Sequence, residues 1–90
     1  MGYSYPLRND WSTEEIIKVV AFFELIEKAY EEGVVQEKII EMYRLFKAIV
    51  PSKSEEKALF KEFEEVSGYE SYRIVKRAKE SAIGELIKGA

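Results

Sequence analysis

Residues 11–33 read WSTEEIIKVVAFFELIEKAYEEG and decide the fold, because they contain the start, body and end of one long helix. Ser12 is a favoured N-cap residue, and Glu15 follows it by three positions, which is the spacing of a capping box. At the other end, Gly33 supplies the left-handed conformation in which helices commonly stop. The sequence therefore predicts a helix over about residues 12–32.

The apolar residues of this segment recur at helical spacing and form one broad face. That face consists of Ile16, Val19, Phe22, Phe23, Ile26 and Tyr30. A helix with such a face must bury it against other elements, so residues 12–32 are expected to be central in the domain.

Three further helices are predicted, over about residues 35–49, 53–67 and 71–82, and each connection between them is short. On the last of these helices, Tyr72, Val75, Ala78 and Ala82 are expected to face inward, and Ile74 lies off that face. Ser52 and Glu55 have the spacing of a second capping box before the third helix. Residues 85–88 are expected to add a loose last helical turn, and no segment has a strand pattern strong enough to compete. Short connections favour antiparallel neighbours.

We therefore predict an all-α fold, a compact bundle of about four short helices in a single domain over residues 1–90. Residues 1–11 precede the first capping signal and are predicted to be an irregular, extended arm. Pro6 favours extended backbone at the residue before it. The arm is expected to lie over the core as a lid.

The amino-acid composition excludes several kinds of chemistry. The chain has 90 residues, a formal net charge of −3, and neither cysteine nor histidine. Disulfides and the serine–histidine and cysteine–histidine nucleophilic systems are therefore excluded. We expect no enzyme, no cofactor and no bound metal. A cysteine-free domain with no long apolar run and no apolar signal core predicts a cytoplasmic protein that does not enter a membrane.

Motifs along most of the chain match a known pattern, and the stretches after Val50 and after Phe63 are the most specific. The matching residues are Tyr5-Pro6, Asp10-Trp11, Glu14-Glu15, Phe22-Phe23, 27–31, Gly33-Val34, Tyr43, Phe46-Lys47, 50–57, Phe63-Glu64, 67–69 and 71–73. On these residues the chain resembles a small bacterial family known as uncharacterised protein family 0223. The resemblance implies an all-α fold in Gram-positive bacteria, and it implies no activity, substrate or site.

Some apolar residues lie off the main helical faces. Ile17 and Leu25 fall on the otherwise polar side of the first helix, and Ile40 is similarly placed on the second. Such residues are either buried in a domain whose helices are covered on two sides, or they form a surface for a partner. We take Ile17, Leu25 and Ile40 as the candidate partner surface.

A second candidate surface is the basic face of the last helix, formed by Arg73, Lys76 and Arg77. Such a face could follow a phosphate backbone. The acidity of the whole chain argues against it. So does Glu64, which stands where a helix-turn-helix has a small residue.

A third candidate is the carboxylate row Glu24, Glu27 and Glu31. Metal sites in helical bundles use carboxylates with histidines that point inward. A solvated face therefore explains these glutamates better than a metal site does.

The sequence alone thus leaves the function open. Our leading hypothesis is a small cytoplasmic protein-interaction module, whose partner is an unidentified protein or a second copy of the chain. The alternative is weak nucleic-acid binding through the basic face of the last helix.

Overall fold

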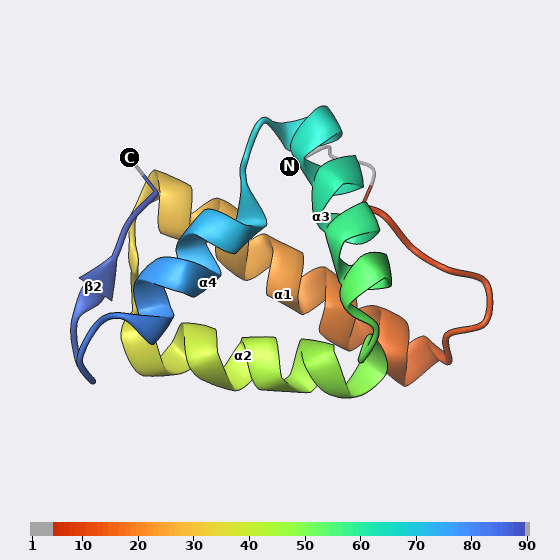
Figure 1. The fold of residues 1–90 in the computed structure, drawn as a ribbon, viewed down its shortest axis with the longest axis horizontal. Helices are drawn as coiled ribbons and strands as arrows, with labels where there is room; N and C mark the ends of the chain where they lie inside the picture. Colours follow the sequence, from red (N-terminus) through yellow and green to blue (C-terminus); the bar gives the residue numbers. More distant parts are fainter. Residues whose placement is uncertain (1–4, 90) are drawn as a thin grey trace.

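A computed structural model describes residues 5–89 of the chain, and its all-α architecture confirms the predicted fold class. Residues 1–4 of the predicted arm lie outside the described residues. The element order is α1 (Thr13–Glu31), β1 (Val34–Val35), α2 (Gln36–Ile49), α3 (Lys53–Ser67), α4 (Ser71–Lys79) and β2 (Leu86–Ile87) (Figure 1).

The predicted signals at the ends of α1 are present. The Ser12 Oγ accepts a hydrogen bond from the Glu15 N–H at 3.1 Å, and the Glu15 carboxylate accepts one from the Ser12 N–H at 2.9 Å. Gly33 follows the helix with φ +95°. At α3 only half of the second capping box forms within residues 5–89. There the Ser52 Oγ accepts from the Glu55 N–H at 3.3 Å.

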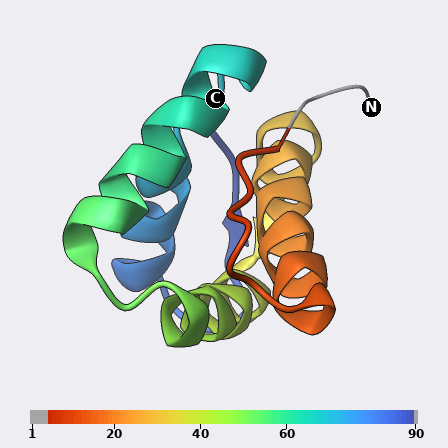
Figure 2. The ribbon, with the colours of Figure 1, turned by 90° about the vertical axis from the view of Figure 1, so that its right-hand side faces the viewer.

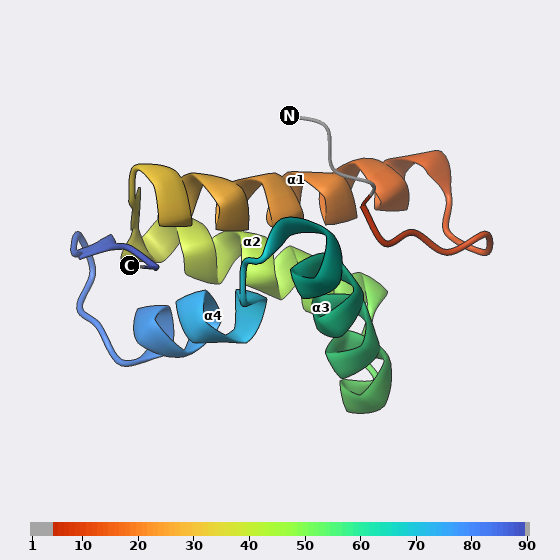
Figure 3. The same ribbon diagram turned by 90° about the horizontal axis from the view of Figure 1, so that it is seen from above.

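The helices do not all run antiparallel to their neighbours. Helices α1 and α2 are antiparallel, and α4 packs on α2 with the opposite direction (Figure 1). Helix α3 instead stands across the other helices, as the view from above shows (Figure 3). The groove described below lies beside this crossing, between α2, α3 and α4.

An aromatic cluster fills the core and joins α1, α2 and α3. It contains all five phenylalanines of the chain, which are Phe22, Phe23, Phe46, Phe60 and Phe63. The rings of Phe22 and Phe46 stack with centroids 4.7 Å apart, and those of Phe23 and Phe63 lie 4.6 Å apart. Large buried rings supply much apolar area per residue, which allows a short chain to form a core.

The inward face of α4 differs from the predicted one. Besides Val75 and Ala78, which were predicted to face inward, Ser71 and Ile74 are buried, whereas Tyr72 is 54% exposed. Our predicted face included Tyr72 and Ala82 and treated Ile74 as misplaced, which was wrong. The physical reason is that the helix ends at Lys79, so Ala82 lies beyond it, and the face that packs on the core follows the helical spacing 71, 74, 75 and 78.

The prediction of a helical turn over residues 85–88 is also wrong. Strand β2 pairs antiparallel with β1, with Val34 opposite Ile87 and Val35 opposite Leu86. The pairing continues where the Gln36 N–H donates to the Glu85 carbonyl at 2.8 Å. Two residues per strand are too few to produce an alternating pattern in the sequence, so the usual strand signal was missing.

Residues 5–11 run between α1 and α3 (Figure 2). The Tyr5 hydroxyl donates to Glu27 of α1 at 2.7 Å, and its ring stacks on Phe63 of α3 with centroids 6.0 Å apart. Arg8 donates two hydrogen bonds to Glu62, at 2.9 and 3.2 Å, and lies 3.6 Å from Glu55. This segment therefore ties the crossing helix α3 to α1.

Candidate functional site

The three residues of the predicted partner surface do not share one environment. Ile17 is 62% exposed on α1. Leu25 and Ile40 are partly buried and pack against the core cluster. The structure therefore leaves Ile17 available to a partner directly, while the other two present only part of their side chains.

The three residues of the predicted basic surface on α4 also differ in their environment. Arg73 and Lys76 are exposed, and neither forms an ion pair with another residue in the range 5–89. Arg77 is partly buried, and its guanidinium donates a hydrogen bond to the Lys88 carbonyl. Arg77 thus holds the segment that contains β2.

Two of the three glutamates in the carboxylate row have protein partners. Glu27 accepts the hydrogen bond from Tyr5, and Glu31 accepts one from the Tyr69 hydroxyl at 3.1 Å. Glu24 is exposed. No group of three or more carboxylates in the described part of the chain is placed to hold a metal ion.

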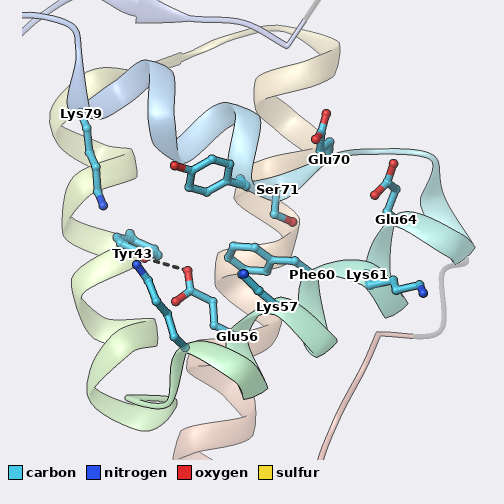
Figure 4. A pocket seen from close by; sticks show the side chains of 11 residues that line it. Tyr43, Glu56, Lys57, Phe60, Lys61, Glu64, Glu70, Ser71 and Lys79 are labelled. Atoms are coloured by element: carbon cyan, nitrogen blue, oxygen red, sulfur yellow. Dashed lines mark hydrogen bonds between the residues drawn. The ribbon is translucent and has the colours of Figure 1, made fainter.

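A groove that sequence reasoning missed lies between α2, α3 and α4, with a volume of about 750 Å³ (Figure 4). Three aromatic side chains line it, one from each helix: Tyr43, Phe60 and Tyr72. The remaining lining residues are polar or charged: Lys53, Glu56, Lys57, Lys61, Glu64, Glu70, Ser71 and Lys79. Its size is that of a typical ligand site.

One wall of the groove contains a buried polar network. The Glu56 carboxylate is 5% exposed and accepts hydrogen bonds from the Tyr43 hydroxyl and the Lys47 ammonium, both at 2.7 Å. Burial, and then the hydrogen bond to Glu56, raise the pKa of Tyr43 well above its usual range. Lys79 lies 5.1 Å from the centre of the Tyr43 ring. The network keeps Tyr43 protonated and neutralises the charge of Glu56.

The charges that remain in the groove are mostly positive. Lys53, Lys57 and Lys61 lie along α3, and none makes a hydrogen bond or ion pair within residues 5–89. With Lys79 the groove has four lysines, against three glutamates of which Glu56 is already paired with Lys47. The chain as a whole has a net charge of −3, so this surface is more positive than the rest of the molecule.

Ser71, the first residue of α4, is the most unusual group in the groove. Its side chain is 0% exposed, and its Oγ has no hydrogen-bond partner among the residues that the structure describes. A buried hydroxyl without a partner costs about 1–3 kcal/mol in desolvation. This cost would be offset by a hydrogen-bond partner supplied from within the groove.

The start of α4 also has unused backbone donors. Its N-cap residue, Glu70, forms no side-chain cap, so the N–H groups of residues 71–73 have no acceptor in the described part of the chain. Tyr30 fixes the position of this helix end, because its hydroxyl bonds to both the N–H and the carbonyl of Glu70, at 3.2 and 3.1 Å. The tyrosine ring also stacks on Tyr69, with centroids 4.6 Å apart.

The sequence contained one signal for this groove. Residues 71, 74, 75 and 78 have the spacing of a helix face, and reading that face as buried would have placed Ser71 inside and Tyr72 outside. The crossing of α3, which opens the groove, has no comparable signal.

In the described part of the chain, no helix has both the length and the apolar character to span a membrane.

Comparison with known proteins finds the same family in every match described below. A model of the uncharacterised protein family UPF0223 matches residues 2–87. A UPF0223 protein from Oceanobacillus iheyensis is 63% identical over 81 residues, covering 90% of this chain and 92% of its own. One from Lysinibacillus sphaericus is 59% identical over 88 residues, covering 98% and 93%. One from Streptococcus pneumoniae is 54% identical over 87 residues, covering 97% and 95%.

Proposed function

Because the chain belongs to the uncharacterised protein family UPF0223, its function must be argued from its own surface, and we propose that it is a protein-binding module. The groove between α2, α3 and α4 holds a segment of the partner protein. The observation that supports this proposal most is the buried Ser71 hydroxyl, which has no hydrogen-bond partner within residues 5–89 and lies in a groove lined by three aromatic side chains.

Aromatic side chains are typical of binding hot spots because they bury a large area at a small entropic cost. Tyr72 is 54% exposed, although it is one of the larger apolar side chains of the domain. Phe60 lies deeper in the same groove, and the Tyr43 ring is held in place by its bond to Glu56. Two of the three rings, Tyr43 and Phe60, are thus already held in place, which lowers the cost of binding.

We propose further that the module is not an enzyme and acts in the cytoplasm. The sequence has no histidine or cysteine, the residues that most often serve as general base and nucleophile. A domain of this size that functions without disulfides suits a reducing compartment.

Ile17 supports a second contact surface for the same function. Its exposure of 62% on α1 leaves the side chain open to self-association or to a second partner. Leu25 and Ile40 would add the exposed parts of their side chains.

Affinity capture from a lysate of Oceanobacillus iheyensis, whose UPF0223 protein is 63% identical to this chain, tests the proposal, with and without nuclease. The baits are the wild type and two matched variants, Tyr72→Glu and Ile17→Glu, each of which replaces one exposed apolar side chain with a carboxylate. We expect a defined protein to be retained by the wild type and Ile17→Glu, and to be lost with Tyr72→Glu.

The other outcomes are equally informative. If Ile17→Glu alone loses the partner, the surface at Ile17 is the binding site and the groove is not. If every protein disappears on nuclease treatment, the basic residues Arg73, Lys76 and Arg77 become the site and the molecule binds nucleic acid. Retention by both variants would overturn the use of either surface.

A further inference from the structure

From the groove chemistry we infer that the partner segment is acidic and places a carboxylate at the N-terminus of α4, against the Ser71 hydroxyl. This inference rests on the proposed protein-binding function and names the chemical class of the partner.

The start of α4 is built to receive an anion. The N–H groups of residues 71–73 lack an acceptor in the described part of the chain, and the helix dipole adds partial positive charge at the same place. The helix has nine residues, long enough for that dipole to develop. A carboxylate there would accept hydrogen bonds that are otherwise unmade.

The Ser71 side chain makes this helix end different from an ordinary one. Its Oγ is buried, unpaired within residues 5–89, and part of the groove lining. The hydroxyl would donate to the incoming carboxylate. At the starts of α1 and α3, by contrast, the hydroxyls of Ser12 and Ser52 already cap their own helices.

Lysines on the opposite wall complete the site. Lys57 projects from α3 into the groove that Ser71 lines from α4 (Figure 4). Glu64 and Glu70 also line the groove and oppose an anion. The four lysines outnumber these two free carboxylates, because Glu56 is neutralised by Lys47.

The shape favours a peptide segment as the occupant. From Lys53 to Glu64 the lining follows α3 for about 16 Å at 1.5 Å per residue. That length accommodates about five residues of extended chain. The aromatic side chains of the groove would contact apolar side chains of the segment, next to its carboxylates.

Two capped hexapeptides provide a direct test, GDFEFG and its neutral counterpart GNFQFG, titrated into the ¹⁵N-labelled full chain. We expect GDFEFG to shift the amide resonances of residues 71–73 and to bind about tenfold more tightly than GNFQFG, since hydrogen bonds to a charged group are stronger than neutral ones. Ser71→Ala should weaken GDFEFG by roughly threefold to tenfold through the loss of one such bond.

Two lysine variants distinguish binding in the groove from nonspecific electrostatic attraction to the protein surface. Lys57→Gln should weaken GDFEFG, whereas Lys18→Gln, which removes the same charge from an exposed position on α1, should not. Equal affinity for the two peptides at residues 71–73 would overturn the acidic preference and leave the groove as a binding surface. Shifts confined to residues 76–77, or no shift at millimolar peptide, would overturn the inference. The affinity capture with Tyr72→Glu, described above, tests the proposed protein-binding function separately.

Discussion

The unpaired hydroxyl of Ser71 predicts that a substitution at the groove will stabilise the fold. Ser71→Ala removes a buried polar group that makes no hydrogen bond within residues 5–89, so no bond is lost. We expect the free energy of unfolding to rise by about 1 kcal/mol, measured by urea denaturation.

Ser67→Ala is the matched control. The Ser67 Oγ donates to the Phe63 carbonyl at 2.7 Å and accepts from the Tyr69 N–H at 3.0 Å. This substitution should lower the free energy of unfolding by about 1 kcal/mol. If both substitutions lower it, the Ser71 hydroxyl contributes to folding and the argument from its unpaired state fails.

The raised pKa of Tyr43 predicts a late step in the alkaline titration of the protein. The neutral phenol is favoured in the folded state, so its contribution to stability is fully present below pH 10 and is lost as the pH rises beyond that. In a spectrophotometric titration, Tyr43→Phe should remove a component that ionises above the usual range of a tyrosine.

At the scale of elements, Gly33 and Gly68 allow the cost of backbone strain to be separated from the cost of steric crowding. Both have positive φ, +95° and +81°, so alanine at either position is strained by about 1–2 kcal/mol. A Cβ at Gly33 would also come within 2.9 Å of the Leu86 and Lys88 side chains, whereas one at Gly68 would meet nothing within 4 Å. Gly33→Ala should therefore lower the thermal midpoint more than Gly68→Ala.

A double substitution checks the cause of that difference. Leu86→Ala removes one of the two side chains that crowd position 33, so it should restore part of the stability lost in Gly33→Ala. If Gly33→Ala is no worse than Gly68→Ala, the contact with the β2 strand is not a constraint on this turn.

The two neighbouring residues of β2 should differ sharply in their contribution to the free energy of unfolding. Ile87 is 4% exposed and belongs to the core, whereas Leu86 is 59% exposed. Ile87→Ala should cost at least about 2 kcal/mol of unfolding free energy, and Leu86→Ala less than about 0.5 kcal/mol. Similar losses in chemical denaturation would mean that β2 does not pack as described.

At the scale of the whole molecule, one core connects every helix, which predicts cooperative unfolding. Trp11 is the only tryptophan, and it packs against the core just before α1. Its fluorescence and the far-ultraviolet circular dichroism should therefore give the same midpoint and slope in urea. An earlier fluorescence transition would show that the segment before α1 opens separately.

The sequence was sufficient for the class of fold because its signals are local. The Ser12 and Glu15 cap, the Gly33 stop and the spacing of apolar residues all act within a few positions of each other. The crossing of α3 and the pairing of β2 with β1 depend instead on contacts between distant segments. The groove is a product of that crossing, so its residues could not be found from local spacing alone.

The pairing of β1 with β2 has a consequence for the order in which the chain acquires its structure. Val34 and Ile87 are separated in sequence by α2, α3 and α4, and closing so long a loop costs on the order of 3–4 kcal/mol in chain entropy. The hydrogen bonds within each helix join residues only four positions apart, so they do not require the C-terminal residues to be present. The last apolar side chain of the core arrives only with Ile87, so a chain released a few residues early would leave Val34 uncovered and be open to proteolysis.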